Sequence, residues 1–179
     1  MPDHTTPTWL AYARQVVEYT ARGDDPNSIN TLPNDTRAHH GVFVTLHKHG
    51  RLRGCMGILD PEQPLEEAVR HAAISAAARD PRFSPVTTAE LADINIEVSI
   101  LSSPYPMRSP DDLELGRHGI IVRRGLQRGL FLPQVAVTHH FDKETLLNRC
   151  CSEKAGLPAD AWRDPDTEVL LFTTDVMQE

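Results

Sequence analysis

Alternating side chains predict a β-hairpin in the first half of the chain. Within residues 41–48, the apolar residues Val42, Val44 and Leu46 occupy alternate positions. A period of two is typical of a strand with one buried face. Residues 51–57 follow directly after His49-Gly50, a pair suited to a two-residue turn. We therefore expect the two segments to pair as antiparallel strands.

The length of this turn sets the expected register. With His49-Gly50 as the turn, Val44 lies opposite Cys55. Cys55 then shares a face with Val44 and Arg53, and His47 points to the other face. This register disfavours a Cys55–His47 pair, unless a bulge or a longer loop shifts the strand by one residue.

Helical spacing of apolar residues predicts three helices, over residues 8–22, 65–79 and about 142–154. The second segment is rich in alanine, which indicates close packing against a sheet. Further strands are expected at residues 94–101, 119–123, 130–133 and 168–173. Because strands and helices do not alternate regularly, the pattern indicates an α+β fold with a mostly antiparallel sheet flanked by helices.

Composition indicates a globular protein and excludes some partners. The 179 residues are 40% hydrophobic and 24% charged, an ordinary range, and we take residues 1–179 as a single domain. A net charge of −7 makes nucleic acid an unlikely general partner. No apolar run approaches the roughly 18 residues that span a bilayer. Three cysteines are an odd count that disfavours a disulfide framework, so we expect a cytoplasmic protein.

The hexapeptide at residues 52–57 joins a thiol, a guanidinium and two glycines. Gly54 and Gly57 carry no Cβ and allow another backbone or a ligand to approach closely. Cys55 is either a nucleophile or a small buried hydrophobe, depending on its surroundings. Arg53 either binds a substrate carboxylate or pairs with a carboxylate of the protein.

Titratable residues outside the hexapeptide are further candidates for a functional site. Glu97 and Asp80 are the expected carboxylate partners of Arg53. Arg82 belongs to the same polar cluster as Asp80, or the two residues only end the preceding helix. Glu97 and His118 are candidate general bases by residue type alone.

Histidine is abundant, but its spacing does not define a metal site. The nine histidines include the pairs His39-His40 and His139-His140. These pairs lack the spaced cysteine or carboxylate ligands of a metal centre, and no metal is expected. The chain also lacks a glycine-rich phosphate loop and a Gly-x-Ser-x-Gly elbow. The sequence assigns no cofactor.

Five motifs follow one another along the chain: Leu52-Arg53-Gly54-Cys55-Met56-Gly57, Asp80-Pro81-Arg82-Phe83-Ser84-Pro85, Glu97-Val98-Ser99-Ile100-Leu101, Leu132-Pro133-Gln134-Val135 and Lys154-Ala155-Gly156-Leu157-Pro158. In this order they resemble the AMMECR domain family, the A component of the AmmeMemoRadiSam system. The resemblance implies two lobes with a cleft between them, and the hexapeptide at or near that cleft. It also implies association with a Memo-like protein and with a radical S-adenosylmethionine protein.

Two functional hypotheses follow. In the first, the protein is an enzyme or enzyme component that acts through the Cys55 thiol on a small carboxylate- or amide-bearing substrate. Arg53 is then the anion clamp, and amide groups around Gly54 and Gly57 stabilise an oxyanion. In the second, the protein is a non-catalytic binding module that presents a small molecule or peptide to partner enzymes. Cys55 is then a packed core residue, and Arg53 and Gln134 shape a recognition groove.

Overall fold

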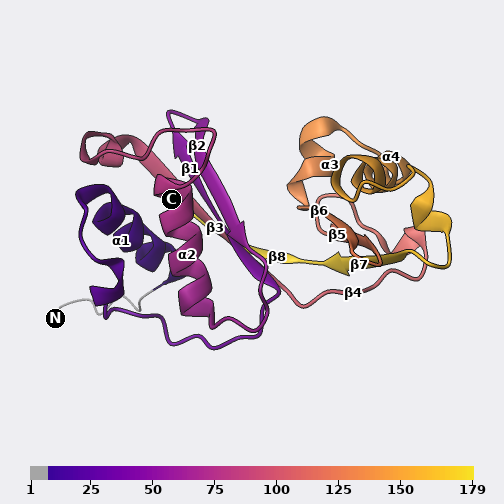
Figure 1. Cartoon of the computed structure of the whole chain (residues 1–179), viewed down its shortest axis with the longest axis horizontal. Coiled ribbons are helices and arrows are strands. Elements are labelled where there is room, and N and C mark those ends of the chain that lie inside the picture. The colour runs from indigo at the N-terminus through magenta and orange to yellow at the C-terminus, as the bar shows by residue number, and fades with distance from the viewer. Residues whose placement is uncertain (1–7) are drawn as a thin grey trace. The chain divides into compact units, whose positions relative to one another are not determined.

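The computed structural model describes residues 8–179, and the chain divides into two compact units. Unit 1 comprises the chain up to Leu101 together with Asp175–Glu179, and unit 2 is Ser102–Thr174. Each unit is built on a four-stranded antiparallel sheet (Figure 1). Within residues 8–179, no helix has the length and apolar character needed to cross a membrane.

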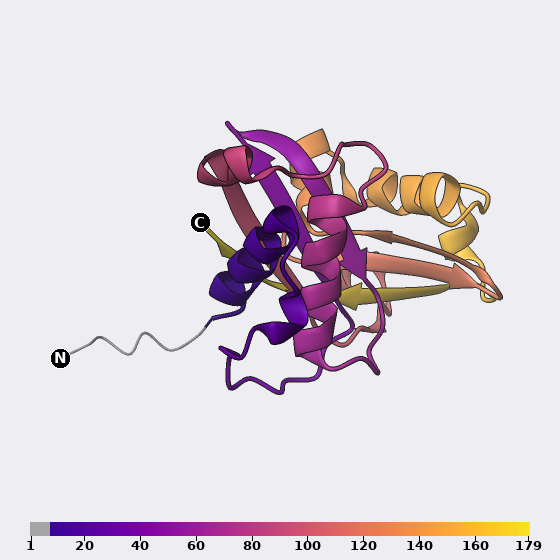
Figure 2. The same ribbon diagram turned by 60° about the vertical axis from the view of Figure 1, so that its left-hand side comes forward.

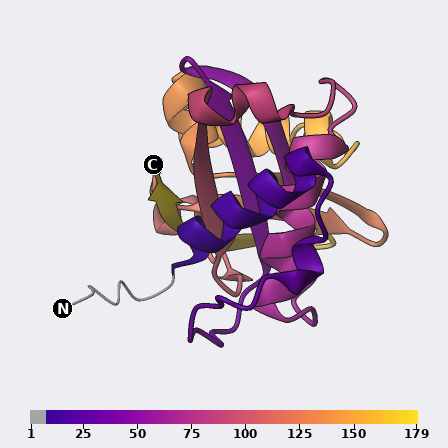
Figure 3. The ribbon, with the colours of Figure 1, turned by 90° about the vertical axis from the view of Figure 1, so that its left-hand side faces the viewer.

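The sheet of unit 1 has the strand order β2-β1-β3-β8. Its strands are β1 (Gly41–Lys48), β2 (Arg51–Ile58), β3 (Ile94–Leu101) and β8 (Thr174–Gln178). Two helices, α1 (Trp9–Arg22) and α2 (Leu65–Ala78), pack on each other and across one face of this sheet, as Figures 2 and 3 show. We call this the helix-covered face.

The core of unit 1 lies between the helices and the sheet. Val44 and Val98 are fully buried on the strands, and α2 contributes alanines such as Ala72 and Ala76. These small side chains allow α2 to lie close to the sheet. The contact is so close that a Cβ built on Gly54 of β2 would lie 2.3 Å from the carbonyl oxygen of Ala76. The prediction that the alanine-rich helix packs closely on a sheet is confirmed.

Local signals explain the ends of the two helices. The Thr8 side chain caps α1 by accepting the N–H of Ala11 at 3.1 Å, and Gly23 ends the helix with a φ of 80°. Helix α2 ends shortly before Asp80-Pro81, since proline disfavours helical geometry at the residue that precedes it.

Unit 2 has the strand order β4-β7-β5-β6. Its elements are β4 (Tyr105–Pro106), β5 (Gly119–Arg124), β6 (Gln127–Phe131), α3 (Gln134–His139), α4 (Lys143–Arg149), a π-helical turn (Cys150–Lys154) and β7 (Glu168–Phe172). The predicted third helix is therefore present, although its last part widens into the π turn. The turn between β5 and β6 is shorter than expected, and the sequence pattern missed α3 and β8.

The α+β class is confirmed, with all described strand registers antiparallel. The cleft between two lobes stays a prediction. Thus the sequence identified the class and most elements, while the detailed pairing of the first hairpin needs a correction.

That hairpin contains a bulge, which makes the predicted register wrong. The turn at His49-Gly50 is present, but Thr45 rather than Val44 lies opposite Cys55. Strand β1 pairs with β3 in one unbroken register, so the extra residue belongs to β2, where Arg53 has no partner across the hairpin. One extra residue moves every later side chain of β2 to the other face.

Candidate functional site

The bulge places Cys55 on the face of the sheet opposite the helices, which we call the open face. Thr45 of β1 pairs with Cys55 on one side and with Glu97 of β3 on the other. The three residues therefore form a row across three strands, roughly 10 Å from end to end. Within this row the Thr45 hydroxyl donates a hydrogen bond to Cys55 Sγ at 3.3 Å. Cys55 is thus neither on the core face nor packed against Val44, as the predicted register required.

His47 also belongs to the open face, because it lies two residues beyond Thr45 on the regular strand β1. Toward β3 it is a diagonal neighbour of Glu97, and such neighbours in a regular sheet are roughly 7–8 Å apart. Toward β2 its partner is Leu52, and the bulge at Arg53 lies between that partner and Cys55. The expectation that His47 faces away from Cys55 is therefore wrong, and the bulge is the reason. We call Thr45, His47, Cys55 and Glu97 the open-face cluster.

A cavity of about 480 Å³ adjoins this cluster. Its wall includes His47 and Glu97, together with Asp93 and Asn95. The volume is within the range of small-molecule sites. Two members of the open-face cluster therefore face a space that can hold a ligand.

The backbone of Cys55 is held by two side chains that follow helix α2. Asp80 accepts the Cys55 N–H at 3.0 Å, and Arg82 Nη2 donates to the Cys55 carbonyl at 3.3 Å. Arg82 also binds both oxygens of Asp80, at 3.0 and 2.7 Å. These hydrogen bonds, those from Arg82 first, hold the pKa of the buried Asp80 carboxyl well below its usual range. Asp80 and Arg82 therefore form one polar cluster that positions Cys55.

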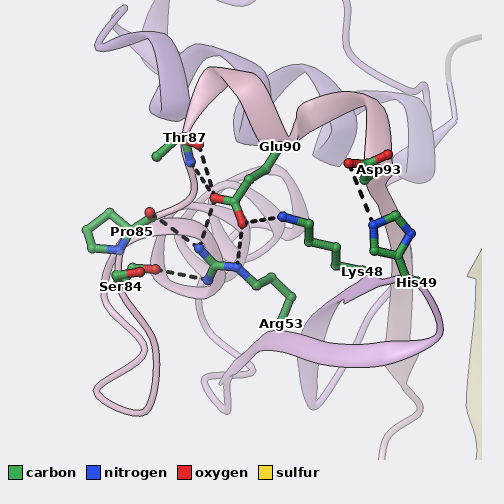
Figure 4. Close-up of polar contacts among 8 residues, drawn as sticks. All are labelled: Lys48, His49, Arg53, Ser84, Pro85, Thr87, Glu90 and Asp93. Atoms are coloured by element: carbon green, nitrogen blue, oxygen red, sulfur yellow. Dashed lines mark hydrogen bonds and ion pairs between the residues drawn. The ribbon is translucent and has the colours of Figure 1, made fainter.

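Arg53 has a different partner from the two that were expected. Its Nε and Nη2 bind Glu90 at 3.0 and 3.1 Å, and its Nη1 donates to the Ser84 carbonyl at 2.9 Å (Figure 4). Lys48 Nζ lies 3.0 Å from the same carboxylate. The expectation of Glu97 or Asp80 is wrong, because the bulge turns the Arg53 side chain toward the segment that precedes β3.

The spacing of Glu90 from Thr87 and Thr88 is that of a helix-capping signal, so the sequence predicts a local role for this residue. It does cap the short 3₁₀ helix Thr88–Asp93, by accepting the N–H of Thr87 at 3.0 Å. Its hydrogen bonds from Arg53 above all, and then from Thr87, hold its pKa well below the usual range. Glu90 therefore has two roles: it caps the short helix and it is the carboxylate partner of Arg53. The capping role alone gives no indication of the second one.

Gly57 has a steric reason for lacking a side chain. A Cβ at this position would lie 2.4 Å from the Phe43 ring, which is its partner across the hairpin. Together with the contact of Gly54 described above, this explains both glycines of the hexapeptide by close approach, as expected. Neither glycine has a positive φ.

Two candidate residues belong to unit 2. His118 is 7% exposed, and its Nδ1 accepts the N–H of Glu114 at 3.0 Å. Its Nε2 lies 2.9 Å from the Tyr105 hydroxyl. Gln134 is exposed at the first position of α3. Unit 1 therefore contains Arg53, Gly54, Cys55, Gly57, Arg82 and Glu97, on different faces and edges of its sheet, and His118 and Gln134 belong to the other unit.

The remaining two cysteines are in a different environment from Cys55. Cys150 and Cys151 are fully buried in the core of unit 2, whereas Cys55 is partly exposed. Burial raises the pKa of the Cys150 thiol to about 12 and also raises that of Cys151. We therefore expect both thiols to be unreactive in the folded protein, since the thiolate is the reactive form.

Possible metal ligands do not cluster in the described part of the chain. Among residues 8–179, no three His, Cys, Asp or Glu residues are arranged to hold a metal ion. The chemistry available at the open face is that of a thiol, an imidazole and a carboxylate.

The fold and the open-face cluster define an α+β protein with a partly exposed thiol on the polar face of an antiparallel sheet. The chain belongs to the AMMECR1 family, whose model matches residues 10–177. A relative from Methanothermobacter thermautotrophicus is 45% identical, covering 96% of this chain and 93% of that protein. Protein PF1979 from Pyrococcus furiosus is 42% identical, covering 93% of this chain and 83% of that protein.

A solved structure has the same fold. The crystal structure of the uncharacterized protein PH0010 from Pyrococcus horikoshii is similar, with a TM-score of 0.83 and 38% sequence identity. The match covers 96% of this chain and 89% of that one. The family resemblance inferred from the motifs is thereby confirmed.

Proposed function

We propose that the protein is an enzyme in which the Cys55 thiolate attacks the carbonyl carbon of a small amide- or ester-bearing substrate. The observation that carries this proposal is the bulged register, which puts Cys55, His47 and Glu97 on one polar face. A nucleophile, a base and an acidic group that orients the base are the parts that covalent catalysis by cysteine requires.

His47 is the general base of this proposal. It takes the proton of the Cys55 thiol, and the sulfur then forms a bond to the carbonyl carbon. When the tetrahedral intermediate breaks down, the bond to the leaving nitrogen or oxygen breaks and that atom receives the proton from His47. Glu97 orients the imidazolium and stabilises its charge. Water then hydrolyses the thioester and regenerates the thiol.

Arg53 takes no part in binding substrate in this proposal, because Glu90 and backbone carbonyls occupy its donors. The Cys55 N–H is also engaged, by Asp80, and is not an oxyanion donor. Arg82 is the better anchor for a substrate carboxylate. Its side chain is 55% exposed, and its Nη1 has no hydrogen-bond partner within residues 8–179.

The test is the rate of alkylation of each cysteine by iodoacetamide as a function of pH, measured by peptide mass spectrometry on the native protein. We expect Cys55 to react, while the buried Cys150 and Cys151 serve as internal controls that react only after unfolding. His47→Gln should remove a step from the pH profile at Cys55. His139→Gln, a change at an exposed histidine of unit 2, should leave the profile as it is.

Two outcomes would count against the enzyme. Resistance of native Cys55 to alkylation would exclude a nucleophile, and identical profiles for wild type and His47→Gln would remove the base. A screen of small amides and esters with Cys55→Ser as the inactive reference then identifies the reaction.

The second candidate function is a binding module that acts with a Memo-like protein and a radical S-adenosylmethionine protein. The observation in its favour is that Arg53 and the backbone of Cys55 are both satisfied within the chain. Because these groups are paired, the hexapeptide at residues 52–57 offers a partner a rigid surface even if the Cys55 thiol takes part in no reaction. Unchanged affinity of Cys55→Ser for both partners, together with an unreactive thiol, would favour this candidate.

A further inference from the structure

We infer that unit 1 has a second ligand site, which binds a small primary ammonium ion with an apolar tail. The site is a cavity of about 340 Å³ between the segment 33–39 and the start of α2. Its volume suits a small organic molecule. None of its lining residues belongs to the open-face cluster, so the inference does not rest on the proposed enzyme.

The first indication is a buried histidine in the wall of this cavity. His39 is 5% exposed, and its Nε2 lies 2.9 Å from the backbone carbonyl of Gln63. A carbonyl oxygen only accepts, so Nε2 carries the hydrogen and Nδ1 is left as an acceptor. That Nδ1 is buried and has no partner within residues 8–179.

The second indication is the side chain of Gln63 itself. Its Nε2 lies 2.8 Å from His71 Nδ1 and is the donor of that pair. Its Oε1 is buried without a partner among the described residues. Buried polar atoms are normally paired, so two unpaired acceptors in one cavity wall indicate a missing donor. Both atoms are shielded in the free protein, and we expect a rotation of one or both side chains toward the ligand.

The charge of the cavity selects a cation as that donor. Its wall carries the carboxylates of Asp35, Glu62 and Glu66 against one guanidinium, that of Arg37. The N-terminus of α2 adds about half a positive charge, which reduces the negative excess without reversing it. An ammonium group supplies both the positive charge and the N–H donors that the two acceptors lack.

The rest of the wall is apolar and accounts for the tail of the ligand. It consists of Trp9, Leu65 and three prolines, Pro33, Pro61 and Pro64. Rigid apolar side chains bind an alkyl or aryl group without losing much conformational freedom. A fully hydrophilic amine would leave this surface uncovered.

The test is an NMR titration of the full chain with n-butylammonium, compared with butyltrimethylammonium. The two ions have the same charge and the same tail, but only the first has N–H donors. We expect saturable shifts at the Trp9 indole and at the amides of Glu62, Gln63, Leu65 and Glu66, with Trp162 of unit 2 as the unaffected reference. Butyltrimethylammonium should bind at least about tenfold more weakly.

Two variants test whether Gln63 binds the ammonium group. Gln63→Met removes one acceptor and should weaken n-butylammonium binding by about tenfold, whereas the matched change Gln15→Met on α1 should not. The amide spectrum of each variant reports directly whether it is folded. Equal binding of the two ions, wild-type affinity in Gln63→Met, or no saturable shift at Trp9 would each overturn the inference. None of these outcomes bears on Cys55.

Discussion

Arg53 stabilises the fold and does not bind a ligand, because Glu90 of the same unit already pairs with its guanidinium. The Arg53 and Glu90 side chains are only 13% and 17% exposed, and two hydrogen bonds join them. A bidentate pair of this kind is stronger than an exposed ion pair. The pair ties the bulge of β2 to the segment that leads into β3.

We predict that Glu90→Gln lowers the free energy of unfolding at pH 7 by about 1.5–3 kcal/mol, because it leaves a partly buried guanidinium without its carboxylate. The measurement is urea unfolding. Glu18→Gln removes an exposed pair with Arg22 on α1 and should change the stability by less than about 0.5 kcal/mol.

The same pair predicts a pH dependence. Since the folded protein holds the pKa of Glu90 below its unfolded value of about 4.3, the carboxylate contributes stability above that value. The contribution is lost as the pH falls through the folded pKa. Between roughly pH 5 and 2, the free energy of unfolding of the wild type should therefore decrease more steeply than that of Glu90→Gln. Parallel curves would show that Glu90 does not contribute in this way.

At the scale of elements, β2 is one of the two outer strands of its sheet, and side chains bind its free edge at Cys55. Asp80 and Arg82 bind the N–H and carbonyl of Cys55 in the way that a neighbouring strand would. The loop after α2 therefore fixes the strand that carries the thiol.

We predict that Asp80→Asn increases the hydrogen-exchange rate of the Cys55 amide and destabilises the protein by about 1.5–3 kcal/mol. The neutral amide keeps one acceptor for Cys55 but loses the charged pair with Arg82. Exchange measured by NMR reports the amide directly. Asp166→Asn, at an exposed position of unit 2, is the control, and equal exchange in both variants would contradict the role of Asp80.

The sequence predicted the elements of this region better than their pairing. Turn residues and alternation were enough to identify β1 and β2. The sequence pattern does not indicate the bulge at Arg53. A register counted from the turn assumes that each residue of one strand pairs with one residue of the other, and a bulge breaks this rule. As a consequence, Cys55 was placed on the wrong face, and His47 was separated from it. The Arg53–Glu90 pair was missed for a related reason, since its two members are far apart in sequence and Glu90 already had a capping role.

At the scale of the whole molecule, unit 1 is discontinuous. Its sheet takes β8 from the chain that follows unit 2. The N–H of Glu179 donates to the Ile96 carbonyl at 3.1 Å, and Glu179 also binds Arg14 of α1. The last residues thus connect a strand and a helix of unit 1.

We predict that removal of residues 175–179 lowers the melting temperature of unit 1 by about 5 °C or more, because it deletes an outer strand and the Arg14 pair. Trp9 reports on unit 1 and Trp162 on unit 2, so indole signals followed by NMR during heating separate the two. We expect an unchanged transition at Trp162. An equal decrease at both tryptophans would show that the units unfold together.

The late position of β8 also bears on how the protein is made. A ribosome delivers α1, the β-hairpin, α2 and β3 first, but the sheet they form gains its fourth strand only after all of unit 2 has been synthesised. Until then, the edge of β3 that β8 will occupy offers free N–H and carbonyl groups to any other strand. The nascent chain therefore passes through a stage at which β3 can pair with a wrong strand, and the synthesis of β8 closes that edge.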